Sequence, residues 1–195
     1  MIEKENFYIY QLTEKDKSYC LEHAKKMCDG FQTYSFKNNI TQSEDVYNIG
    51  KIGELVLYKF IKEFGNKKII KIPHVPFRES YDKINFNDDF IIDIENKLIQ
   101  LEVKTKCRNV EPELYYECCI DCIKPHLIYI FLSYNRKTDI VSLLGFADWS
   151  NLKLHANPIL KGNENVNFKH KANEFDIQIQ YLNNINTLIE HCKSI

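Results

Sequence analysis

Apolar residues recur at helical spacing twice in the N-terminal third of the chain. The first stretch, residues 13–28, opens with Thr13 and carries Asp16 three positions later, an arrangement typical of a helix start. The second, residues 43–64, repeats an apolar residue or a glycine every three or four positions. Both stretches are predicted to be helices with one buried face, and Gly30 is expected to stop the first of them.

Two glycines lie on or beside the apolar face of the second predicted helix. Gly50 and Gly53 carry no side chain, so the helix can approach a sheet closely there, despite a propensity cost of about 1 kcal/mol for each glycine. Glu54 follows directly. It is therefore expected to be an acidic residue beside a packing interface, which is an unusual place for a carboxylate.

Apolar runs of strand length predict a sheet in the middle of the chain. Residues 68–72 suit a short strand. Residues 89–93 and 97–106 suit the two strands of a hairpin, because both are rich in β-branched or apolar residues and a short polar turn separates them. The continuous apolar run 126–133 is typical of a central strand covered on both faces, and 139–145 suits its neighbour.

The remaining part of the chain alternates between short elements and polar segments. Residues 147–154 suit a short helix, 158–173 are polar and irregular, 174–181 alternate like a strand, and 184–192 suit a final helix. No internal repeat or convincing linker interrupts the pattern. The order of elements predicts an α/β fold with a central mixed sheet flanked by helices.

Composition and charge limit the classes of binding partner but do not identify one. The 195 residues are 44% apolar and 27% charged, which suits one self-folding domain, and the net charge of −1 argues against a chain-wide grip on nucleic acid. Only Arg78, Arg108 and Arg136 are arginines, so phosphate contact is easier to supply than base readout. No apolar stretch reaches the roughly 18 residues of a membrane span. We expect a cytoplasmic protein with no membrane partner.

The candidate chemistry concentrates in the predicted hairpin. Residues two apart in a strand face the same way, so Glu102 and Lys104 project together. If the hairpin turns through a two-residue loop, paired positions sum to 191 and Asp89 lies opposite Glu102; a three-residue loop would bring Asp88 there instead. Two converging carboxylates repel unless a cation neutralises them, and their hard oxygen atoms favour Mg²⁺ or Mn²⁺.

This arrangement resembles the PD-(D/E)XK nuclease superfamily. The resemblance is carried by Asp89, by Glu102-Val103-Lys104 and by Glu54 within Gly50-Lys51-Ile52-Gly53-Glu54, although Asn87-Asp88-Asp89 replaces the proline-aspartate that names the family. It implies a restriction-endonuclease-like core in which a helix precedes a three-stranded meander, a crossover helix and a further strand. By the resemblance, residues 43–150 form the nuclease core, 1–42 a helical extension, and 151–195 a strand and helix that complete the domain.

The resemblance also implies a role for each residue of the site. Asp89 and Glu102 would bind Mg²⁺, with Mn²⁺ able to substitute, the Val103 carbonyl would be a further ligand, Glu54 would complete or support the site, and Lys104 would position the attacking water. Thr105, Lys106 and Arg108 would contact nucleic acid. The expected activity is hydrolysis of DNA without a small-molecule cofactor, in restriction, phage or mobile-element DNA processing or repair, and a homodimer would allow double-strand cleavage.

Three alternatives remain open. A catalytically inactive nucleic-acid-binding or assembly module can keep the same fold, since fold does not guarantee activity. An RNA-directed nuclease would use the same chemistry. Seven cysteines without a secretory signal indicate reduced thiols, and the group of Cys107, Cys118, Cys119, Cys122 and His126 is either buried packing or a further metal site.

Overall fold

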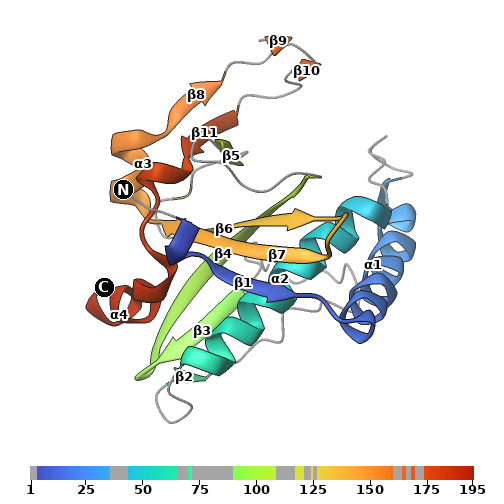
Figure 1. The fold of residues 1–195 in the computed structure, drawn as a ribbon, viewed down its shortest axis with the longest axis horizontal. Helices are drawn as coiled ribbons and strands as arrows, with labels where there is room; N and C mark the ends of the chain where they lie inside the picture. The colour runs from blue at the N-terminus through green and yellow to red at the C-terminus, as the bar shows by residue number, and fades with distance from the viewer. Residues whose placement is uncertain are drawn as a thin grey trace.

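The chain folds around a six-stranded mixed sheet, seen in a computed structural model (Figure 1). The structure describes residues 4–35, 44–65, 70–71, 90–108, 117–120, 124, 127–159, 164–165, 168–169 and 174–195. In spatial order the strands of the sheet are β1 (Tyr8–Gln11), β7 (Ile140–Ala147), β6 (Ile128–Asn135), β4 (Lys97–Arg108), β3 (Phe90–Ile94) and β2 (Ile70–Lys71). All neighbours are antiparallel except β4 and β6, which are parallel.

One face of the sheet is covered by a long helix. Helix α2 (Glu44–Phe64) runs alongside β4 in the opposite direction, and α1 (Glu14–Ser35) packs on α2 (Figure 1). The larger hydrophobic core lies between α2 and this face, and it takes alternate residues of β3, β4 and β6, which all point toward the helix. The predicted helix over residues 43–64 is therefore confirmed.

The opposite face is covered over β6 and β7, and β5 (Glu117–Ile120) contacts β4. A second core lies there, formed by Tyr129 and Phe131 of β6 and Leu144 and Ala147 of β7 together with α3 (Trp149–His155), β11 (Glu174–Gln178) and the 3-10 helix η2 (Ile179–Tyr181). All eight residues of β6 are buried, as expected for a strand covered on both faces. This confirms the predicted central strand.

The remaining elements lie outside the main sheet. Strands β5, β11 and β8 form a three-stranded sheet, and β9 and β10 form a short pair at the far end of an arm that rises from the body (Figure 1). The chain ends in α4 below this arm. The bounds of these elements are η1 (Lys4–Asn6), β5 (Glu117–Ile120), β8 (Asn157–Ile159), β9 (Glu164–Asn165), β10 (Phe168–Lys169), η3 (Ile185–Thr187) and α4 (Leu188–Ser194).

The structure differs from expectation in three places. Helix α1 continues through Gly30 to Ser35, because one glycine costs only about 1 kcal/mol of helix propensity, which does not by itself end a helix of this length. The N-terminal segment is more than a helical extension, since β1 is an edge strand of the main sheet. Between β4 and β6 the described residues contain the strand β5 and no helix, so the crossover helix is not seen among them.

The sheet and its flanking helices make the protein an α/β fold. Within the described ranges, no helix combines the length and the apolar character that crossing a membrane requires. The polar segment 158–173 contains the short strands at the end of the arm, and other parts of it lie outside the described residues.

Candidate active site

The β3–β4 hairpin has the register that the candidate site requires. Its turn consists of Glu95 and Asn96, both with positive φ (54° and 68°), and the pairs that flank it, from Ile94 with Lys97 onward, all sum to 191. The two-residue loop is therefore confirmed. The expected partners of Glu102, Asp89 and its alternative Asp88, lie outside the described residues.

Glu102 and Lys104 form an ion pair on one face of β4. Lys104 Nζ lies 2.9 Å from Glu102 Oε1, and the two side chains are 26% and 15% exposed. Strand alternation explains the pairing, because residues i and i+2 of a strand project in the same direction. The carboxylate and the ammonium are thus held together at a largely covered position, with Glu102 Oε2 buried.

Strand alternation also decides which face of the sheet carries this pair. Val103 and Thr105 face α2, since a Cβ built on Gly53 would lie 3.2 Å from Val103 Cγ1 and 1.8 Å from Thr105 Oγ1. Glu102 and Lys104 therefore lie on the other face. There they neighbour Tyr129 and Phe131 of β6, both buried in the second core.

The expected phosphate contact of Thr105 is corrected by this geometry. Thr105 Oγ1 is buried against α2 and makes no hydrogen bond within the described part of the chain. It cannot reach a substrate bound beside Lys104, because the two residues are on opposite faces of one strand. Lys106 and Arg108 have the same parity as Lys104; Lys106 is exposed and Arg108 is half-buried.

Glu54 belongs to a buried ion pair on α2. Lys51 Nζ donates to Glu54 Oε1 at 2.8 Å and to Oε2 at 2.6 Å, and the side chains are only 6% and 8% exposed. Burying two charges is costly unless each is paired, so Lys51 accounts for the presence of a carboxylate at this depth. The i, i+3 spacing of the two residues was visible in the sequence, and Lys51 is the partner that sequence reasoning missed.

The position of Glu54 relative to the sheet follows from helix geometry. Glu54 comes one residue after Gly53, so it points about 100° away from the direction of the sheet. Glu63 lies nine residues later, on the opposite flank of the helix. Its Oε2 accepts a hydrogen bond from the Tyr8 hydroxyl of edge strand β1 at 2.8 Å. Glu54 therefore lies on the flank directed away from β1, toward the part of the sheet that holds β4 and β3.

The Lys51–Glu54 pair also lies within electrostatic reach of α1. Burial, together with the carboxylates of Asp16 and Glu54, raises the pKa of the Cys20 thiol to about 12, although Lys51 opposes them. Glu54 contacts Lys51 of the same helix, and the sheet lies between this pair and Glu102. A role of Glu54 in the site is therefore support from the helix side rather than a shared face with Glu102.

The described residues hold part of the expected metal site. They contain no group of three His, Cys, Asp or Glu side chains close enough to hold an ion, and Asp89 is not among them. Val103 lies on β4 two residues after Leu101. The described pairing of β4 with β3 ends at Leu101, and the pairing of β4 with β6 begins there. Among the cysteines, Cys107 is a free, half-buried thiol; Cys122 and His126 lie outside the described residues.

Among the described residues, Glu102 supplies the carboxylate of the candidate site. Its Oε1 lies 2.9 Å from Lys104 Nζ and its Oε2 is buried. Carboxylate oxygens are the ligands that a hard divalent cation prefers, and the adjacent ammonium suits an anionic substrate such as a phosphodiester. No family model, curated protein or solved structure matches the chain. The case for the site's chemistry therefore depends on these residues and their geometry.

Proposed function

We propose that the protein is a Mg²⁺-dependent nuclease with a restriction-endonuclease-like core that hydrolyses phosphodiester bonds of DNA. The observation that carries the proposal is the Glu102–Lys104 pair, with 2.9 Å between Nζ and Oε1, on a strand whose hairpin register sums to 191. The same register is the one in which Asp89 is expected opposite Glu102. Restriction, phage or mobile-element DNA processing and repair are the settings in which such an activity is used.

Glu102 and Asp89 are the residues proposed to hold the cation, with the Val103 carbonyl as a further ligand. A bound Mg²⁺ would stabilise charge on the phosphate and lower the pKa of a coordinated water. Glu102 is suited to this role because its carboxylate lies beside the Lys104 ammonium, on the face of β4 opposite α2. Glu54 supports the site from α2, through its buried pairing with Lys51.

Lys104 is proposed to orient the attacking water and the phosphate. Its Nζ carries three N–H donors, of which one is directed to Glu102 Oε1. With substrate bound, the ammonium would donate to the water oxygen or to a non-bridging phosphate oxygen. An ammonium beside the reacting phosphate stabilises the additional negative charge of the transition state more than that of the ground state.

A cleavage assay tests the proposal. The purified protein is incubated with supercoiled plasmid, single-stranded DNA and single-stranded RNA, each with Mg²⁺, with Mn²⁺ or with EDTA. We expect metal-dependent cleavage of DNA, and at least a hundredfold slower cleavage by Glu102→Gln and by Lys104→Ala, on the scale of losing one preorganised charged group. Glu190→Gln and Lys193→Ala are matched controls, since these residues form an exposed carboxylate–ammonium pair on α4.

The outcomes separate the proposal from its alternatives. Full activity in folded Glu102→Gln and Lys104→Ala would remove the assignment. DNA binding without cleavage in any metal would instead indicate a catalytically inactive binding module, and preferential cleavage of RNA would identify an RNA-directed enzyme. Circular dichroism of each variant establishes that the fold is retained.

A further inference from the structure

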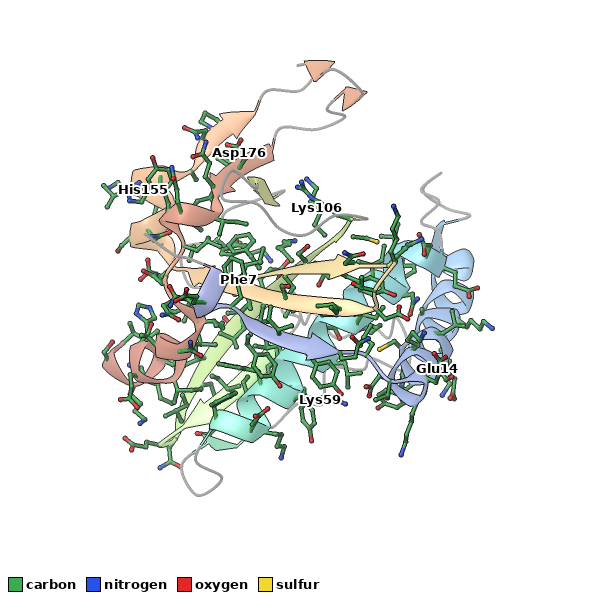
Figure 2. The ribbon with its side chains drawn as sticks, in the orientation of Figure 1. Phe7, Glu14, Lys59, Lys106, His155 and Asp176 are labelled. Carbon is green, nitrogen blue, oxygen red and sulfur yellow. The ribbon has the colours of Figure 1, made fainter. Side chains whose placement is uncertain are left out.

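The face of β4 that carries Glu102 continues as a row of basic residues. Lys104, Lys106 and Arg108 share the parity of Glu102, so all four project from the same face of the strand. We call the three basic residues the β4 basic row. Figure 2 shows Lys106 pointing away from the main sheet, toward the side on which β5 lies.

Charge is separated along this face. Asp93 on β3 is paired with Leu98, an even-numbered residue of β4, so it lies on the Glu102 face near the hairpin end. The basic row occupies the other half of β4, from Lys104 to the end of the strand. Acidic groups suited to a cation and basic groups suited to phosphate thus lie in sequence along one surface.

The next strand adds polar rather than apolar neighbours to the basic row. In the parallel β4–β6 register Lys106 pairs with Ser133 and Arg108 with Asn135, whereas Glu102 and Lys104 pair with Tyr129 and Phe131. Ser133 and Asn135 are buried, at 2% and 7% exposure. The second core therefore ends near Lys104, and beyond it the face of the sheet is polar.

The spacing of the basic row suits a chain of phosphates. Residues two apart in a strand are about 7 Å apart, so the row places three basic side chains at regular intervals along the strand. Successive phosphates of an extended nucleic-acid strand are separated by a similar distance. Backbone tracking of this kind is independent of sequence, because lysine ammonium groups contact phosphates without reading base edges.

We propose that the β4 basic row binds the sugar-phosphate backbone of one nucleic-acid strand and directs it from the candidate site toward β5. This inference rests on the proposed function and adds to it the path of the substrate and the absence of sequence readout. Lys104 contacts the phosphate at the site, and Lys106 and Arg108 contact the following phosphates along the strand. Thr105, on the opposite face, takes no part.

A binding experiment without cleavage tests the row. Fluorescence anisotropy measures the affinity of the full chain, in the Glu102→Gln background with EDTA, for fluorescent single-stranded and duplex oligonucleotides over a series of salt concentrations. Lys106→Ala and Lys106→Ala/Arg108→Ala are compared with Lys106→Arg, which keeps the charge. Lys62→Ala is the control, because Lys62 is an exposed lysine on α2, across the sheet.

The slope of log affinity against log salt is the decisive quantity. For Lys106→Ala we expect the slope to fall by about 0.7 with a single strand or about 0.9 with a duplex, by about twice as much in the double variant, and equally for unrelated base sequences. Lys106→Arg and Lys62→Ala should keep the parent slope. A double variant with the parent slope and affinity, or a loss confined to one base sequence, would overturn the inference.

The same experiment keeps the two proposals apart. If the Glu102 and Lys104 variants lose cleavage while the slope is insensitive to Lys106 and Arg108, the nuclease assignment stands and the row is refuted. If the slope falls as expected while the Glu102 and Lys104 variants cleave normally, the row is a binding surface and the catalytic assignment fails.

Discussion

Gly53 of α2 lies directly against Thr105 of β4. A Cβ at Gly53 would be 1.8 Å from Thr105 Oγ1 and 3.0 Å from Thr105 Cβ, distances that real side chains do not tolerate. The contact brings the helix onto the strand that carries Glu102 and Lys104 on its other face. Packing at Gly53 therefore sets the distance between α2 and the strand of the candidate site.

Adding one methyl group at this contact should destabilise the fold. We expect Gly53→Ala to lower the free energy of unfolding by roughly 1–3 kcal/mol, because overpacking outweighs the gain of about 1 kcal/mol in helix propensity. Gly50→Ala is the matched control; among the described residues, no atom outside the adjoining helix backbone lies within 4 Å of its added Cβ, so it should leave stability unchanged or raise it. Urea unfolding measures both, and equal stability of the two variants would contradict the close contact.

The Lys51–Glu54 pair should depend on both partners. Lys51→Met removes the ammonium that pairs with a buried carboxylate and is expected to cost about 3–5 kcal/mol, whereas Lys51→Met/Glu54→Leu should regain most of that stability. If Glu54 supports the site, the stable double variant loses cleavage by about 10- to 100-fold, the usual effect of removing a supporting group around a metal. If the folded double variant cleaves DNA as fast as wild type, Glu54 has no role in the site beyond its ion pair with Lys51.

Asp16 lies at the centre of a buried polar network that joins α1, α2 and β1. Its Oδ2 accepts hydrogen bonds from the Tyr10 hydroxyl (2.9 Å) and from Thr13 N and Oγ1 (3.1 and 2.8 Å), and its Oδ1 pairs with Lys59 Nζ at 2.8 Å. Burial by itself would raise the pKa of Asp16. The hydrogen bonds from Lys59, Thr13 and Tyr10 outweigh it and lower the pKa from 3.8 to about 2.

This network should make stability fall in acid. A carboxyl whose pKa is lower in the folded state stabilises the fold above its unfolded value, so the contribution is lost as pH falls from about 4 to 2. It amounts to roughly 2 kcal/mol at 1.36 kcal/mol per pKa unit. Thermal unfolding between pH 2 and 6 should show a flatter pH profile for Asp16→Asn than for wild type. Glu190→Gln, at an exposed carboxylate, should keep the wild-type profile; a steep profile in Asp16→Asn would contradict the assignment.

The hairpin turn offers a test of the β3–β4 register. Glu95 has a φ of 54°, a conformation that asparagine adopts more readily than glutamate, so Glu95→Asn should raise the unfolding free energy by about 0.5–1 kcal/mol. Glu95→Val should lower it, because β-branched residues are strained at positive φ. Melting temperatures that do not separate the two variants would indicate a different turn, and with it a different partner for Glu102.

Local patterns in the sequence were sufficient to predict the main helices and strands and to place Glu102 and Lys104 on the same face of their strand. The spacing of apolar residues predicted α2, and Thr13 with Asp16 predicted the start of α1, because helix periodicity and capping involve residues a few positions apart. The two-residue turn at Glu95–Asn96 and strand alternation likewise followed from neighbouring residues. Glu102 and Lys104 were therefore placed on one face before any tertiary contact was known.

Only the tertiary structure decided how these elements meet. The parallel pairing of β4 with β6 and the edge position of β1 depend on contacts between segments far apart in the chain. The packing of α2 on the Val103 face assigned Thr105 to the helix and left Glu102 and Lys104 on the other side. Burial of Lys51 with Glu54 has the same origin, since the cost of burying a charge is determined by the packing around it.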